Sequence, residues 1–107
     1  MDINNEIIKI TDAIINAVPV ERIYLFGSYA NNLANNASDY DFFLLLPDEG
    51  VRPLEAAMKA RRALSSIQRK TPVDILADYQ SRFDVRRRLN TLERRIWNDG
   101  VVLYERK

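Results

Sequence analysis

The sequence predicts an α/β fold of the α+β kind, in which a mixed sheet is flanked by helices. Two observations predict it. Short apolar runs rich in β-branched and aromatic residues alternate with longer amphipathic segments, and Gly, Pro or Asn-rich turns separate them. The expected order α-β-α-β-α-β-α(α)-β places helices against the sheet. At 107 residues, the chain is expected to be one domain, residues 1–107, with a single core.

The helices are predicted from apolar residues at helical spacing and from the residues that end them. The first would end at Pro19, and a short second helix over about 29–36 would have Ser28 as its N-cap. A third would run from Pro53 to about Arg69, and the last third of the chain would be helical. The expected buried faces are Ile3, Ile7, Ile10, Ile14 and Val18; Ala57, Ala60, Leu64 and Ile67; and Val85, Leu89, Leu92 and Ile96.

The strands are predicted from short runs of β-branched, aromatic and aliphatic residues that stop at turn residues. A turn over Pro47–Gly50 follows the second strand, and Thr71-Pro72 precedes the third. The last strand is expected at an edge of the sheet. The four predicted strands are 22–26, about 39–46, 73–77 and 101–104.

Composition narrows the possible chemistry. The chain has no cysteine and no histidine, which excludes disulfides, thiol nucleophiles, Cys- or His-ligated metals and imidazole catalysis. Any reaction must therefore depend on carboxylates, hydroxyls, Lys, Arg or a hard metal ion. No apolar run is long enough for a membrane span, and the first residues do not resemble a signal peptide, so a cytoplasmic location is expected.

A pair of aspartates, Asp39 and Asp41, precedes the apolar run of the second predicted strand. Alternate side chains of a strand share a face, so the two carboxylates would project together. Their repulsion and lost hydration would be offset by a divalent cation, Mg²⁺ being the expected one. The competing interpretation, a turn followed by a solvated carboxylate, suits Asp39 but not Asp41, because five apolar residues follow Asp41.

Gly27 and Ser28 lie where the first strand is expected to end and a helix to begin. Glycine permits a tight turn and close approach of a ligand, and the N–H groups of a helix start suit a phosphate. Asp74 interrupts the third predicted strand. It would join the same site if the two strands are neighbours, and would otherwise be an edge-strand charge facing water. Three carboxylates beside a phosphate-binding turn would suit one or two Mg²⁺ ions.

The Gly-Ser pair, ten residues, Asp39-x-Asp41 and a later single aspartate in a short strand together resemble the nucleotidyltransferase superfamily of DNA polymerase β. The segments YLFGSYA and GVVLYER look like its minimal nucleotidyltransferase branch, and the resemblance covers nearly the whole chain. It implies that Asp39 and Asp41 bind the metals that hold the nucleotide. Asp74 would ligate the metal that activates the acceptor hydroxyl, and Gly27 and Ser28 would hold the β- and γ-phosphates.

The resemblance also implies an activity and a partner. Members of this family attach a nucleoside monophosphate to a hydroxyl and release pyrophosphate, and many are antitoxins of a HEPN-domain ribonuclease toxin. The expected function is therefore Mg²⁺-dependent transfer of AMP from ATP to a hydroxyl of a HEPN toxin, in a complex of the two proteins. The family often has Arg-Gly where this chain has Asn31-Asn32. That departure favours one alternative, an antitoxin that only binds its toxin; a second alternative is nucleotidyl transfer to RNA or a small molecule.

Six arginines are concentrated in residues 82–95, against two acidic residues. They could contact triphosphate, RNA or an acidic partner, or they could be the solvated face of an amphipathic helix. The formal net charge of +1 offers no global electrostatic argument for nucleic-acid binding.

Overall fold

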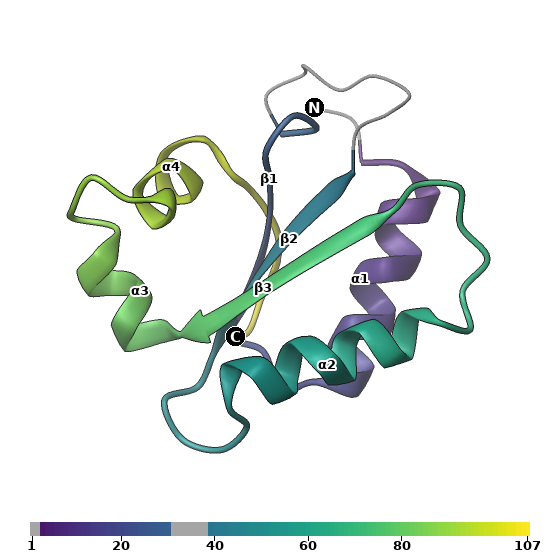
Figure 1. Ribbon diagram of the computed structural model, residues 1–107, viewed down its shortest axis with the longest axis horizontal. Helices are drawn as coiled ribbons and strands as arrows, with labels where there is room; N and C mark the ends of the chain where they lie inside the picture. The colour runs from purple at the N-terminus through teal and green to yellow at the C-terminus, as the bar shows by residue number, and fades with distance from the viewer. Residues whose placement is uncertain (1–2, 31–38) are drawn as a thin grey trace.

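The fold is a four-stranded mixed sheet with helices on both faces (Figure 1). A computed structural model describes residues 3–30 and 39–107. The helices α1 and α2 cover one face of the sheet, and α3 and α4 lie against the other (Figure 1). In chain order the elements are α1 (Asn5–Ala17), β1 (Arg22–Phe26), β2 (Tyr40–Leu46), α2 (Pro53–Leu64), β3 (Val73–Tyr79), α3 (Gln80–Arg86), α4 (Leu92–Asp99) and β4 (Val101–Glu105).

The strand order β3-β2-β1-β4 confirms the predicted mixed sheet and the predicted edge position of the last strand. β2 pairs with β3 in parallel and with β1 antiparallel, and β1 also pairs antiparallel with β4. β2 is buried on both faces: Phe42 and Leu44 pack in the core beneath α1 and α2, whereas Phe43 and Leu45 pack with Phe83 in a second cluster. This burial explains why β2 reads as a continuous apolar run.

The first helix confirms its predicted buried stripe with one exception. Asn4 caps α1, because its side-chain oxygen accepts a hydrogen bond from the Ile7 N–H, at 2.8 Å. Ile7, Ile10 and Ile14 are fully buried. Ile3 was expected in the same stripe but is exposed, because it precedes the cap and so lies outside the helix.

The second long helix is shorter than predicted. It ends at Leu64 and not near Arg69, and Ile67 is only half-buried. Ser65 donates its hydroxyl hydrogen bond to the Arg62 carbonyl, and the Arg69 guanidinium donates to the Leu64 carbonyl at 2.9 Å. These side-chain bonds satisfy carbonyls that a continuing helix would use, so they help to end it. The third strand is longer than predicted and continues to Tyr79.

The single apolar stripe predicted for the last third is wrong. The segment contains two helices, α3 and α4, and Val85, Leu89 and Leu92 are exposed. The apolar residues that bury there are Phe83 and Ile96, so Ile96 is the one member of the predicted stripe that is buried. Thr91 starts the second helix, since its side chain accepts from the Arg94 N–H and its hydroxyl donates to the Arg86 carbonyl. A helix that restarts at an N-cap no longer keeps the earlier residues in phase with the later ones.

Only the first part of the short helix predicted after Ser28 lies within the described residues. Residues 27–30 form a turn, and the rest of the predicted helix, including Asn31 and Asn32, lies outside the described residues. Within the two described ranges, no helix has the length and apolar character needed to cross a bilayer.

Candidate active site

The end of the inner strand β1 and the start of the inner strand β2 lie side by side at one end of the sheet, and Gly27 and Asp41 touch there. Gly27 has a φ of +77°, a backbone conformation that favours glycine. A Cβ atom at this position would collide with Oδ2 of Asp41 and would lie 3.3 Å from its Cγ. The glycine therefore allows the chain to turn directly against the Asp41 carboxylate. Two predicted site residues from separate segments are thus in contact.

Asp74 also lies beside Asp41. β2 and β3 are parallel neighbours, and Asp41 pairs with Asp74 in their register. Paired residues on adjacent strands point to the same face of a sheet, so the two carboxylates share one face. The condition under which Asp74 could join the site, that the two strands are neighbours, is met. Asp74 is at the same time on an edge strand, with its side chain 58% exposed.

The electrostatics of the site centre on Asp41. Burial raises the pKa of the Asp41 carboxyl above its usual value, and the negative charges of Asp74 and then Asp39 raise this pKa further. Asp39 precedes β2 and is exposed. The half-buried carboxylate of Asp41 is thus destabilised in its charged form by its own surroundings. A cation at this point would relieve that cost.

The donor set suits Mg²⁺, which prefers carboxylate and other hard oxygen ligands. The side chains as they stand, however, do not form a complete cage: among residues 3–30 and 39–107, no group of three or more acidic side chains is close enough to hold one ion. Asp39 and Asp74 are both exposed and can change rotamer. Ligation by all three predicted aspartates would require such a change toward Asp41.

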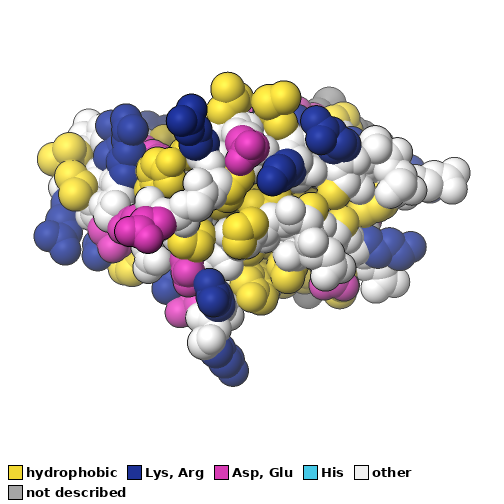
Figure 2. Space-filling model, turned by 90° about the horizontal axis from the view of Figure 1, so that it is seen from below, with side chains coloured by type: hydrophobic (Ala, Val, Ile, Leu, Met, Phe, Trp, Pro, Cys, Tyr) yellow, Lys and Arg dark blue, Asp and Glu magenta, His cyan; other side chains and the backbone are white. Residues whose placement is uncertain are grey.

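Three of the six arginines in residues 82–95 have structural partners. Figure 2 shows basic side chains at the end of the molecule formed by α3 and α4, with acidic and hydrophobic side chains among them. Arg86 forms an ion pair with the buried Glu93, and Arg82 lies 3.5 Å from Asp78. The Arg87 guanidinium pairs with Asp84 and also lies 4.0 Å from the centroid of the Trp97 ring. These contacts support the structural interpretation for three of the six arginines.

The comparisons with known proteins identify the family and the fold. The family model described as polymerase beta, nucleotidyltransferase matches residues 8–107. The chain belongs to the polymerase beta nucleotidyltransferase family. The family resemblance and the fold predicted from the sequence are therefore confirmed. No curated protein matches the chain.

Solved structures of toxin–antitoxin systems share the fold of this nucleotidyltransferase family member. A toxin–antitoxin crystal structure with AMP-PNP is 26% identical, with a TM-score of 0.62, over 97% of this chain and 76% of that chain. A crystal structure of a toxin–antitoxin MntA-HpeT mutant is 23% identical, with a TM-score of 0.58, over 98% and 75%. A protein from Sulfolobus solfataricus is 19% identical, with a TM-score of 0.61, over 92% and 76%. The latter two similarities show the fold alone.

One charged residue at the candidate site was missed by sequence reasoning. Arg61 of α2 reaches the edge strand β3, where its guanidinium donates to the Ile75 carbonyl at 3.2 Å. The same Nη2 atom lies 3.7 Å from Oδ1 of Asp74. Asp74 thus already has a positive neighbour. No sequence pattern indicated this contact, because it depends on how α2 lies across the edge of the sheet.

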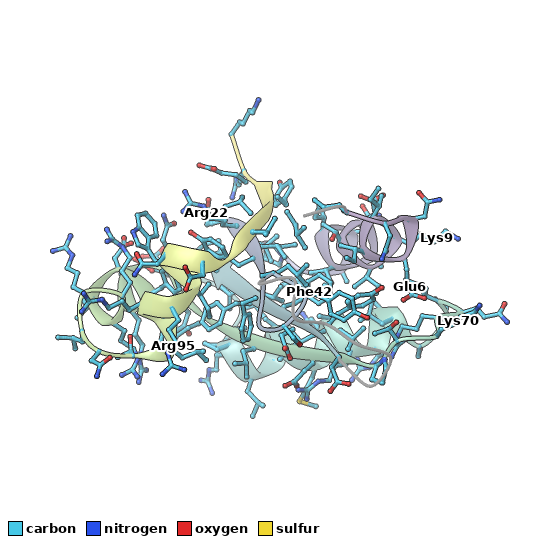
Figure 3. All side chains as sticks on the ribbon, turned by 90° about the horizontal axis from the view of Figure 1, so that it is seen from above. Glu6, Lys9, Arg22, Phe42, Lys70 and Arg95 are labelled. Carbon is cyan, nitrogen blue, oxygen red and sulfur yellow. The ribbon has the colours of Figure 1, made fainter. Side chains whose placement is uncertain are left out.

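A small cavity also adjoins the site. It has a volume of about 230 Å³ and lies between the end of β1 and α4. Phe26 at the end of β1 and Gly27 in the turn that follows line it on one side, and Leu92, Arg95 and Ile96 line it from the helix. Arg95 lies on the α4 side of the molecule, whereas Glu6 and Lys9 lie on the α1 side and Phe42 lies between the two layers (Figure 3). The apolar residues of α4 were read from the sequence as core, so no cavity was expected.

Proposed function

We propose that this chain is a Mg²⁺-dependent nucleotidyltransferase that transfers AMP from ATP to a hydroxyl of a HEPN-domain toxin, for which it is the antitoxin. The observation that carries the proposal is the pairing of Asp41 with Asp74 on neighbouring strands, directly beside the Gly27 turn. Membership of the polymerase beta nucleotidyltransferase family supports the reaction class. The 26% identical toxin–antitoxin structure with AMP-PNP supports the nucleotide and the kind of partner. A cytoplasmic location is part of the proposal.

The roles proposed for the residues follow their places at the sheet edge. The turn at Gly27 and Ser28 would hold the β- and γ-phosphates, since backbone N–H groups in a turn can bind anions. Asp39 and Asp41 would hold the metal that binds the triphosphate. Asp74 lies on the far side of Asp41 from the Gly27 turn, because β2 separates β3 from β1. The acceptor hydroxyl would therefore approach from the β3 side.

The transfer itself is an in-line displacement. The acceptor oxygen forms a bond to the α-phosphorus as the bond from that phosphorus to the bridging oxygen breaks, pyrophosphate leaves, and the hydroxyl proton passes to solvent. Mg²⁺ held by Asp39, Asp41 and Asp74 would neutralise phosphate charge and lower the pKa of the acceptor hydroxyl. The chain itself positions the two substrates on opposite sides of Asp41, so that the attacking oxygen and the leaving pyrophosphate are separated.

A transfer assay tests this proposal. The purified chain is incubated with Mg²⁺ and radiolabelled ATP in the presence of a HEPN-domain toxin, tRNA or a small hydroxyl acceptor. The expected result is AMP mass on the toxin, lost in the Asp39→Asn, Asp41→Asn double variant. Radioactive label on RNA or on the small molecule would instead identify that molecule as the acceptor. Equal absence of label with wild type and double variant would refute transfer to the toxin.

A second candidate function is a binding-only antitoxin. It is favoured by the contact between Asp74 and Arg61, which leaves Asp74 paired with a cation from the chain itself. It is also favoured by Asn31-Asn32, which stand where the family often has Arg-Gly. In that case the double aspartate variant would still protect cells from the toxin. Calorimetry would then show no Mg²⁺-dependent binding of ATP to the wild type.

A further inference from the structure

The cavity between β1 and α4 lies on the same face of the sheet as the acidic residues. Phe26 pairs with Asp41 in the register of β1 and β2, and Asp41 pairs with Asp74 in the register of β2 and β3. These three residues therefore form one row across the sheet, with their side chains on one face. Phe26 lines the cavity at one end of this row, and Asp74 stands at the other.

The cavity also borders the turn proposed to seat the phosphates. Gly27 lines it directly. If the triphosphate of a nucleotide lies on Gly27 and Asp41, its nucleoside can extend either toward β3 or toward α4. Asp74 and Arg61 occupy the β3 side, where the acceptor would approach. The α4 side offers a concavity.

The lining of the cavity suits a flat, partly apolar group. Phe26, Leu92 and Ile96 supply apolar surface, and aromatic and aliphatic side chains are the usual walls for a nucleobase. Its volume of about 230 Å³ is below the roughly 300–1,000 Å³ of pockets that enclose whole ligands. The space is thus sized for part of a nucleotide. The phosphates would remain outside, over the turn.

We propose that this cavity binds the base of the nucleoside triphosphate substrate, between Phe26 and α4, with Leu92 as one wall. This inference rests on the proposed nucleotidyltransferase function and assigns the part of the site that recognises the base. The residues that the sequence singled out are proposed to contact only the phosphates and the metal, so those roles do not distinguish one base from another.

Two charged residues at the cavity supply polar recognition. Arg95 and Asp99 line it from α4. Within the part of the chain that the structure describes, neither belongs to an ion pair. An ionised carboxylate only accepts hydrogen bonds. Asp99 can therefore accept from the exocyclic amino group of adenine, whereas uracil presents a carbonyl oxygen at the corresponding edge, and Arg95, which only donates, can bond a ring nitrogen of adenine.

The test separates the base from the phosphates. Binding of ATP and of inorganic tripolyphosphate, each with Mg²⁺, is measured by calorimetry for the wild type and for Leu92→Trp, which fills the cavity. The expected result is a loss of ATP affinity of at least tenfold, with tripolyphosphate affinity unchanged within twofold. Leu89→Trp is the matched control, because Leu89 is also exposed, precedes the same helix and does not line the cavity; it should change neither affinity.

A second variant keeps the proposal testable if the tryptophan points away from the cavity. Wild type should bind ATP more tightly than UTP, and Asp99→Asn should reduce the ratio of the ATP affinity to the UTP affinity by at least threefold. If Leu92→Trp changes ATP and tripolyphosphate binding equally and Asp99→Asn leaves the preference intact, the base lies elsewhere and the inference is wrong, although the proposed function stands. If the wild type binds neither ligand, the proposed function fails and the inference fails with it.

Discussion

Replacing Gly27 with alanine tests the contact on which the candidate site depends. The substitution has two costs in the folded state. A non-glycine residue at a φ of +77° costs about 1–2 kcal/mol. The new Cβ also collides with Asp41 Oδ2, and forcing that carboxylate off its rotamer costs about 0.5–1.5 kcal/mol. Together these lower the free energy of unfolding by about 1.5–3.5 kcal/mol.

The same substitution should also reduce nucleotide binding, because the displaced Asp41 carboxylate no longer faces the turn. We expect Mg²⁺-dependent affinity for ATP to fall by at least about tenfold, equivalent to about 1.4 kcal/mol. Urea denaturation followed by circular dichroism gives the stability, and calorimetry gives the affinity.

Gly50→Ala is the matched control for this experiment. Gly50 also has a positive φ, +113°, but nothing lies within 4 Å of a Cβ added there. It should lose stability through backbone strain, about 1–3 kcal/mol, and keep its affinity for ATP. If Gly27→Ala matches the wild type in both measurements, or if both variants lose affinity equally, the proposed role of the contact between Gly27 and Asp41 in nucleotide binding is refuted.

Three further predictions test the electrostatics and the packing. The raised pKa of Asp41 means that its ionisation opposes folding, so Asp41→Asn should be more stable than wild type at pH 7. In urea denaturation this stability advantage should shrink as the pH falls toward 3.8, the ordinary pKa of an aspartate; an advantage that does not change with pH would contradict the raised pKa. Arg61→Gln removes an exposed pair worth about 0.2–1 kcal/mol, so Mg²⁺ should bind up to about fivefold more tightly by calorimetry, and weaker binding would show that Arg61 assists the site. Phe83→Ala should lower the free energy of unfolding, measured by urea denaturation, by about 3–5 kcal/mol because Phe83 is fully buried. Val85→Ala, at a side chain 64% exposed, should change it by no more than about 0.5 kcal/mol, and the reverse order would support the single apolar stripe.

Local signals in the sequence were sufficient for most elements. The α1 stripe of Ile7, Ile10 and Ile14 and the strand β1 follow from periodicity and residue type alone, and the structure confirms both. The prediction that was wrong is the single apolar stripe in the last third of the chain. A helical periodicity that runs through Val85, Leu89 and Ile96 does not show that a new N-cap at Thr91 divides it. Side-chain capping bonds compete with helix continuation on a scale of about 1 kcal/mol, which a periodicity argument does not include.

The sequence by itself determined the family, the mixed sheet and the identity of the candidate ligands, because these depend on residue types at short spacings and on the alternation of strands and helices. Only the tertiary structure decided which of them meet. Asp41 and Gly27 touch, and Asp74 is paired with Asp41, because strands that are distant in the chain are neighbours in the sheet and bring these residues to the same end of it. The contact of Arg61 with Asp74 depends on the packing of α2 against the sheet, and the cavity beside Gly27 depends on the packing of α4. No local sequence pattern encodes either arrangement.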